Sequence, residues 1–81
     1  MNEYQKELQA MRPDDEIQTP EYAPRDKGYQ FIPTASHGYL VVPKNDKNAR
    51  IAKKICEYGY IGDIAYYLEE DSEAGNFIRS I

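Results

Sequence analysis

Few side chains in this 81-residue chain could take part in catalysis or metal binding. His37 is the single histidine and Cys56 the single cysteine, and the two are far apart in the sequence. A histidine-rich metal site, or a Cys-His nucleophilic pair with an orienting third group, would have to be built from these single residues. We therefore expect a structural role for His37, with its ring hydrogen-bonded to the backbone of its loop.

The acids Glu69, Glu70 and Asp71 form the other group with possible metal chemistry. Three consecutive side chains on a strand do not point to one place, and Asp71 can instead cap a following helix. A carboxylate pair for hydrolysis needs a cleft that so small a domain could hardly enclose. Gly59 and Gly62 are too few, and precede no helix, for a phosphate-binding loop. The sequence therefore predicts no enzyme, no metal site and no cofactor.

The clearest helix pattern covers residues 45–57, with Asn45 or Asp46 as its cap. At 100° per residue, one arc of this helix carries the apolar residues Ala49, Ile51, Ala52, Ile55 and Cys56. The opposite side carries four cations, Lys47, Arg50, Lys53 and Lys54. This basic face is either a solvated surface or a docking surface for phosphates or for acidic side chains of a partner. Spacing alone does not separate these readings.

Eight tyrosines are a large number for a chain of this length. A small domain has a thin core, so several of them should be exposed. They are either half-buried strand residues or parts of an interface, where tyrosine is enriched. In the second reading the acids of the C-terminal third surround the tyrosines. The expected partner-binding face then consists of Tyr58, Tyr60, Asp63, Tyr67, Glu69, Glu70 and Glu73.

Short strands must position these residues. Residues 29–33 and 39–43 have strand patterns that each end at a proline, and an antiparallel hairpin is the simplest interpretation of the pair. Residues 58–68 read as a second hairpin that turns at Gly62-Asp63, a pair suited to positive φ. Alternation along its second strand puts three side chains on the expected core face, namely Ile64, Tyr66 and Leu68.

A last helix should begin after Asp71 or Ser72 as its cap, with Glu73 in the first turn, where the helix dipole favours an acid. Its apolar positions recur at helical spacing, at Ala74, Phe77, Ile78 and Ile81. The element order is then β-β-α-β-β-α. The predicted fold is α+β, a small four-stranded antiparallel sheet with two helices on one face.

Residues 1–27 have a different composition from the rest of the chain and are expected to form an N-terminal arm, leaving residues 28–81 as the compact domain. Tyr4, Leu8 and Met11 have the spacing of a short helix, which Pro13 would end. The acid- and proline-rich stretch that follows buries too little apolar surface to order by itself. The arm is either an inert leader or a segment that orders against a partner or a second copy. Its anchors would be Tyr4, Ile17 and Tyr22.

Charge is distributed unevenly along the chain, whose formal net charge is −4. Residues 44–56 hold five bases and one acid, whereas residues 57–81 hold six acids and one base. Most of the surface would therefore repel a generic polyanion, and a protein partner fits this balance better than DNA. A lone cysteine and the lack of a long apolar stretch favour a reducing, cytoplasmic location without a membrane span.

The run from Ser36 to Pro43 (Ser-His-Gly-Tyr-Leu-Val-Val-Pro), followed by Tyr58, Tyr60, the run Tyr67-Leu68-Glu69-Glu70-Asp71 and Phe77, resembles a family of small proteins encoded by phages, plasmids and other mobile elements. Members carry a similar His-Gly-aromatic-Leu-x-Val-Pro run and a later Tyr-Leu-Glu-Glu-Asp run. The resemblance covers residues 34–78. It implies a mobile-element context, in which small acidic proteins without active sites often inhibit host machinery by binding it.

Three functional hypotheses follow. The first is a non-enzymatic phage-type protein that inhibits or modulates a host protein, such as a defence or nucleic-acid-processing factor, through its acidic, tyrosine-rich face. The second is a small nucleic-acid-binding module that uses the basic helix at residues 45–56. The third is a sponge for nucleotides, formed at the interface of a homo-oligomer.

Overall fold

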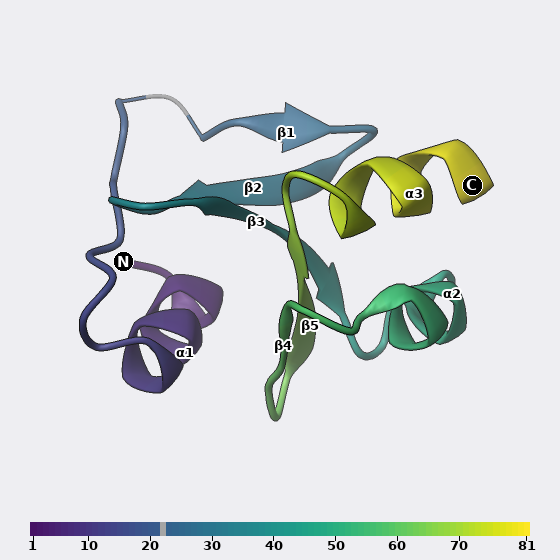
Figure 1. Ribbon diagram of the computed structural model, residues 1–81, viewed down its shortest axis with the longest axis horizontal. Coiled ribbons are helices and arrows are strands. Elements are labelled where there is room, and N and C mark those ends of the chain that lie inside the picture. The colour runs from purple at the N-terminus through teal and green to yellow at the C-terminus, as the bar shows by residue number, and fades with distance from the viewer. Residues whose placement is uncertain (22) are drawn as a thin grey trace.

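The computed structural model describes residues 1–21 and 23–81, which form an α+β fold around one antiparallel sheet (Figure 1). The sheet has five strands in the spatial order β1-β2-β3-β5-β4. Their bounds are Arg25–Asp26 for β1, Tyr29–Pro33 for β2, Gly38–Pro43 for β3, Tyr60–Ile61 for β4 and Ala65–Glu69 for β5. The predicted class is confirmed. The predicted count of four strands is wrong, because it omits β1. A strand of two residues is too short to show an alternating pattern.

The turn between β1 and β2 contains the positive φ angles that the sequence analysis expected at Gly62-Asp63. Lys27 has φ 49° and Gly28 has φ 88°, the pattern of a two-residue hairpin turn of type I′. Gly62 serves a different purpose. A Cβ atom there would collide with the carboxylate of Glu7, so glycine is needed for a close approach and not for its φ angle.

The centre of the sheet is the pairing of β3 with β5, which runs from Tyr39 opposite Glu69 to Pro43 opposite Ala65. Both strands are buried on both faces. Tyr39, Val41, Ala65 and Tyr67 belong to one core cluster, and Leu40, Val42, Tyr66 and Leu68 belong to another. The expectation of one core face, with Ile64 on it, is therefore wrong. Both sets of alternating residues are core, and Ile64 is 36% exposed.

Two helices, α2 (Ala49–Ile55) and α3 (Glu73–Ser80), cover one face of the sheet. The predicted apolar residues of α2, and Ala74, Phe77 and Ile78 of α3, pack on the cluster of Leu40, Val42 and Leu68, with Phe77 fully buried. Ile81 lies beyond the end of α3 and is 37% exposed, so its predicted place on the apolar face is wrong. Helix α2 is shorter than the predicted 45–57. Asp46 does not cap it, because the Asp46 carboxylate accepts hydrogen bonds from the hydroxyl of Tyr29 (2.6 Å) and the backbone N–H of Asn48 (2.9 Å).

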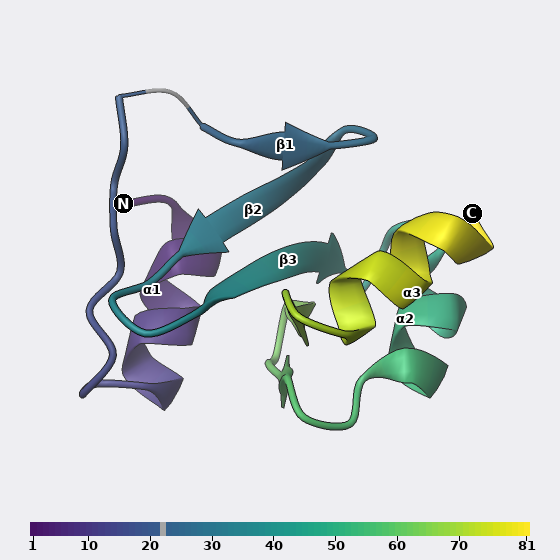
Figure 2. The same ribbon diagram turned by 45° about the horizontal axis from the view of Figure 1, so that its top comes forward.

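Helix α1 (Glu3–Met11) covers the opposite face, so the helices do not all lie on one side (Figures 1 and 2). The predicted helix in this region is confirmed, and Asn2 and Gln5 close its start with a capping box. Leu8 is 0% exposed and Ile17 is 7% exposed, and both lie in the cluster of Tyr39 and Tyr67. Leu8 and Ile17, with Tyr4 and Met11 packed against them, therefore complete the core on this face of the sheet.

Within the described part of the chain, no helix has both the length and the apolar character that crossing a membrane requires.

Candidate functional site

Two members of the predicted partner-binding face lie inside the protein. Tyr67 is 0% exposed and Glu73 is 3% exposed, so neither can meet a partner, and their assignment to that face is wrong. Alternation along β5 could not reveal the burial of Tyr67, because β5 is buried on both faces. The remaining members, Tyr58, Tyr60, Asp63, Glu69 and Glu70, are exposed or partly exposed.

The buried carboxylate of Glu73 organises the chain around the start of β4. It accepts hydrogen bonds from the backbone N–H groups of Glu57 (2.6 Å), Tyr58, Gly59 (2.9 Å) and Glu69 (3.2 Å). A carboxylate that accepts several backbone N–H bonds satisfies donors that would otherwise be buried without a partner. Glu73 thus holds the segment before β4 against the end of β5, which brings Tyr58 close to Glu69.

Exposed apolar side chains concentrate along β4, which is an edge strand of the sheet. Tyr58 is 73% exposed just before the strand, Ile61 is 58% exposed within it, and Ile64 is 36% exposed in the turn after it. Asp63 is exposed beside them, whereas the half-buried Tyr60 packs edge-on against the Tyr39 ring, with 5.7 Å between ring centroids. We call this set, Tyr58, Tyr60, Ile61, Asp63 and Ile64, the β4 edge surface.

The turn at one end of this surface is fixed by Glu7 of α1, a residue that the sequence analysis missed. The Glu7 carboxylate accepts hydrogen bonds from the Asp63 backbone N–H (2.5 Å) and from the Tyr67 hydroxyl (2.6 Å). Burial, followed by this hydrogen bond and the Glu7 charge, raises the pKa of Tyr67 well above its ordinary value. The β4 edge surface is therefore held at both ends by carboxylates from other elements.

A second buried carboxylate, Asp15, fixes the loop before β3. It accepts hydrogen bonds from the Thr34 hydroxyl (2.8 Å) and the Ser36 backbone N–H (3.0 Å). Burial raises the pKa of Asp15, but these hydrogen bonds outweigh burial and hold the pKa below its ordinary value. Asp15 and Glu7 both come from the segment that was expected to be an arm.

The predicted arm anchors have different locations. Tyr4 is half-buried and packs on the core cluster of Leu8, and Ile17 is buried in that cluster. Tyr22 lies outside the described residues. Tyr4 and Ile17 therefore pack against the core of their own chain, and we do not assign them to a partner-binding surface.

His37 is exposed, and its backbone rather than its ring makes the loop contacts. Its N–H donates to the Thr34 hydroxyl (3.0 Å), and its carbonyl accepts from the Thr34 N–H (2.9 Å). The predicted hydrogen bond from the ring to the loop backbone is not among the contacts of the described residues. Cys56 is half-buried, and burial raises the pKa of its thiol to about 11, which makes it a poor nucleophile.

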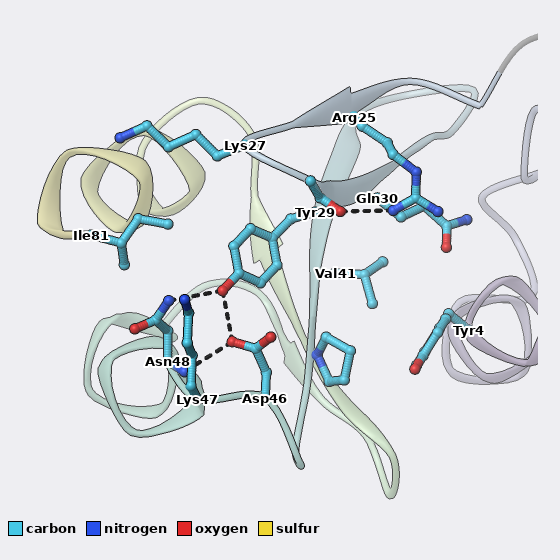
Figure 3. A pocket seen from close by; sticks show the side chains of 12 residues that line it. Tyr4, Arg25, Lys27, Tyr29, Gln30, Val41, Asp46, Lys47, Asn48 and Ile81 are labelled. Atoms are coloured by element: carbon cyan, nitrogen blue, oxygen red, sulfur yellow. Dashed lines mark hydrogen bonds between the residues drawn. The ribbon is translucent and has the colours of Figure 1, made fainter.

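The four predicted cations, Lys47, Arg50, Lys53 and Lys54, are all exposed. Lys47 precedes α2 and also lines an open cavity of about 680 Å³ between the β1–β2 hairpin and the loop before α2 (Figure 3). Arg25 and Lys27 line the same cavity, although both side chains also bind backbone carbonyls, of Gly28 (2.7 Å) and Ile78 (3.1 Å). The cavity thus groups Lys47 with two cations of the β1–β2 hairpin and not with Arg50, Lys53 or Lys54.

One wall of this cavity is the ring of Tyr29. Its hydroxyl donates to Asp46 and accepts from the Asn48 side chain at 2.9 Å (Figure 3). Its ring also meets the ring of Phe77 edge-on, with 5.1 Å between ring centroids. These contacts fix the ring in place. The cavity combines an aromatic wall with three cations and one carboxylate side chain, a chemistry that favours anionic ligands.

The fold and these surfaces define a small α+β domain with an open antiparallel sheet, covered by helices on both faces. No family model, curated protein or solved structure matches the chain in a comparison with each of these sets. The assignment of function therefore depends on the chemistry of the surfaces described above.

Proposed function

We propose that this protein acts without catalysis, by binding and modulating another protein through the β4 edge surface. The observation that carries this proposal is the exposure of Tyr58, Ile61 and Ile64 on and beside an edge strand. Exposed apolar side chains grouped in one region are typical of protein interfaces. An edge strand also offers unpaired backbone groups to a strand of a partner.

Charge indicates which kind of partner this surface suits. Asp63 is an exposed acid on this surface and Glu57 is an exposed acid just before Tyr58, whereas Arg12, which follows α1, is engaged by the hydroxyl and ring of Tyr60. A basic protein surface therefore complements it, since opposite charges steer association and exclude wrong partners. A nucleic-acid-processing or defence factor of a bacterial host is the partner class that we propose. The mobile-element resemblance of residues 34–78 supports this context and a cytoplasmic location.

Capture from bacterial lysate, with quantitative mass spectrometry, tests the proposal. Asp63→Lys should reduce recovery of the partner about tenfold or more, whereas the matched change Asp26→Lys on the opposite edge strand, β1, should leave it unchanged. Ile61→Lys should act like Asp63→Lys. Equal recovery with wild type and all three variants would refute the β4 edge surface as the binding site.

A second candidate function is binding of a phosphate-rich ligand, such as a nucleic-acid strand or a nucleotide. The specific observation in its favour is the cavity that brings Arg25 and Lys27 beside Lys47 and the Tyr29 ring. Fluorescence anisotropy with a labelled single-stranded oligonucleotide at low salt tests it. Lys47→Glu should weaken binding and reduce its salt dependence, whereas Lys6→Glu on α1 should do neither. No binding at low salt would exclude the nucleic-acid version.

A nucleotide sponge would instead bind free nucleotides at an interface between copies of the chain. Light scattering coupled to size exclusion and thermal shift with nucleotides test this version. A monomer that no nucleotide stabilises would remove it, whereas a dimer lost in Ile61→Lys would assign the β4 edge surface to self-association.

A further inference from the structure

The pairing of β3 with β5 places three metal-binding side chain types at one end of the two strands. Tyr39 is opposite Glu69, and the next pair outward is joined by a hydrogen bond from the Glu70 N–H to the Gly38 carbonyl (3.1 Å). His37 directly precedes β3 and Asp71 lies in the turn that follows β5, so both residues leave the paired strands at the end where Tyr39 is opposite Glu69. Opposite residues of paired strands have Cβ atoms about 5 Å apart, which brings His37 and Asp71 near each other and near Glu69.

The ligand atoms of these three side chains also lie close together. One ring nitrogen of His37 and one carboxylate oxygen each of Glu69 and Asp71 all lie within 4.8 Å of one another. Ligand atoms about 2.0–2.2 Å from a common metal ion are about 3–4 Å apart, so small side-chain rotations bring these three atoms to that geometry. His37 and Asp71 are exposed and Glu69 is half-buried, so an ion can enter from solvent.

We propose that His37, Glu69 and Asp71 form a binding site for a divalent transition-metal ion, with Zn²⁺ the best match. An imidazole nitrogen with two carboxylate oxygens is a donor set typical of zinc and its first-row neighbours. Three protein ligands also leave at least one position open for water or for a group of a partner. Ca²⁺ and Mg²⁺ fit less well, because they prefer sites made of oxygen ligands alone.

The proposed site does not require the three consecutive acids, Glu69, Glu70 and Asp71, to point to one place. The middle acid, Glu70, is not part of the site and lies toward the opposite face, where it lines a small cavity with Phe31, Leu40 and Ala74. The ligands are instead the alternate acids Glu69 and Asp71, joined by a histidine from the neighbouring strand. Sequence reasoning missed this combination because it requires the register of β3 against β5.

The surroundings hold Glu69 in place. The Asp71 backbone N–H and the Ser72 hydroxyl each donate to a Glu69 oxygen at 3.2 Å. Hydrogen bonds of this kind orient metal ligands. No lysine or arginine occurs between residues 55 and 78, so two carboxylates approach each other within a segment that supplies no cation of its own.

The experiment uses the untagged full chain and Zn²⁺ alone. Since His37 is the single histidine, its ring gives one set of imidazole proton signals in the NMR spectrum. Addition of Zn²⁺ should shift these signals and saturate at one ion per chain, and calorimetry should give the same stoichiometry. His37→Ala and Asp71→Asn should each weaken binding roughly tenfold or more. Because both residues are exposed, these variants should retain the thermal unfolding midpoint of the metal-free protein.

Two matched variants separate this site from other zinc ligands. Glu70→Gln removes the adjacent acid that points away and should bind Zn²⁺ like the wild type. Cys56→Ser removes the thiol, the strongest competing zinc ligand, and should also bind like the wild type. Unchanged imidazole signals in excess Zn²⁺, or equal affinity in His37→Ala and the wild type, would overturn the proposal. Loss of binding in Cys56→Ser alone would assign the ion to the thiol instead.

Discussion

At the scale of single residues, carboxylates that accept backbone hydrogen bonds connect distant segments of this small structure. Glu73 accepts four backbone hydrogen bonds from two separate segments, and Glu7 accepts from the turn after β4 and from Tyr67. An acid in the first turn of a helix is ordinarily a weak, exposed contribution to the helix dipole. Glu73 occupies this position, but its carboxylate fixes the path of the chain. Its replacement should therefore lower the free energy of unfolding substantially.

Replacement of Glu73 by alanine should lower the free energy of unfolding by about 2–3 kcal/mol. Four backbone donors around a side chain that is 3% exposed would lose their acceptor, and a buried unsatisfied donor costs about 1–3 kcal/mol. Urea unfolding followed by circular dichroism measures the change. The matched control is Glu70→Ala, an exposed acid three residues earlier, which should change stability by less than about 0.5 kcal/mol.

Cys56 should be slow to react with thiol reagents. A pKa of about 11 leaves roughly two orders of magnitude less thiolate at pH 8 than in an ordinary cysteine. The rate of reaction with a disulfide reagent in the folded protein, compared with the rate in 8 M urea or in a short peptide around Cys56, tests this. Equal rates in folded protein and peptide would contradict burial of the thiol between α2 and β4.

At the scale of elements, α1 is part of the folded unit. It supplies Leu8 to the core, Glu7 to the β4–β5 turn, and the Gln9 side chain that accepts from the Ile17 backbone N–H (2.9 Å). The sheet face beneath α1 holds Ile32, Val41 and Tyr67, which would be exposed without it. An amphipathic helix is stabilised mainly by such packing and not by its own propensity.

Replacement of Leu8 by alanine should therefore lower the free energy of unfolding by about 3 kcal/mol, because the side chain is 0% exposed. Thermal unfolding monitored by circular dichroism measures it. Ala10→Gly on the exposed side of the same helix controls for helix propensity and should cost about 1 kcal/mol. A Leu8→Ala variant as stable as the wild type would mean that α1 is a detachable arm after all.

At the scale of the whole molecule, α1 and the sheet share one core cluster, and folding shifts the pKa values of Asp15 and Tyr67 in opposite directions. The pKa of Asp15 is lowered by folding, so its contribution to stability is present above about pH 4 and is lost as pH falls through the folded value. The pKa of Tyr67 is raised, so its contribution is present below about pH 10 and is lost as pH rises above that value.

The unfolding midpoint should consequently decline on both sides of this range. Asp15→Asn should be less stable at neutral pH and should flatten the acid limb, and Tyr67→Phe should flatten the alkaline limb. Urea midpoints measured from pH 3 to pH 11 test both changes. An acid limb that is equally steep in wild type and Asp15→Asn would assign it to other carboxylates.

Local patterns in the sequence were enough to predict the helices and strands that have a clear period. The strands around Leu40 and Leu68, the apolar arcs of α2 and α3 and the helix that Pro13 follows were all predictable, because alternation and helical spacing are local properties. The α+β class followed from their order. The exposed cations of α2 were predictable for the same reason, since one side of a surface helix must face water.

Which residues lie close together across the sheet could not be predicted from these local patterns, because it depends on how distant segments pack. Glu73 and Tyr67 were expected on a binding face, and their burial depends on where the segment before β4 and helix α1 pack. The meeting of His37 with Glu69 and Asp71 depends on the β3–β5 register, which no local pattern of either strand contains. Such contacts arise from the pairing of distant segments, whereas the sequence patterns report only on neighbours along the chain.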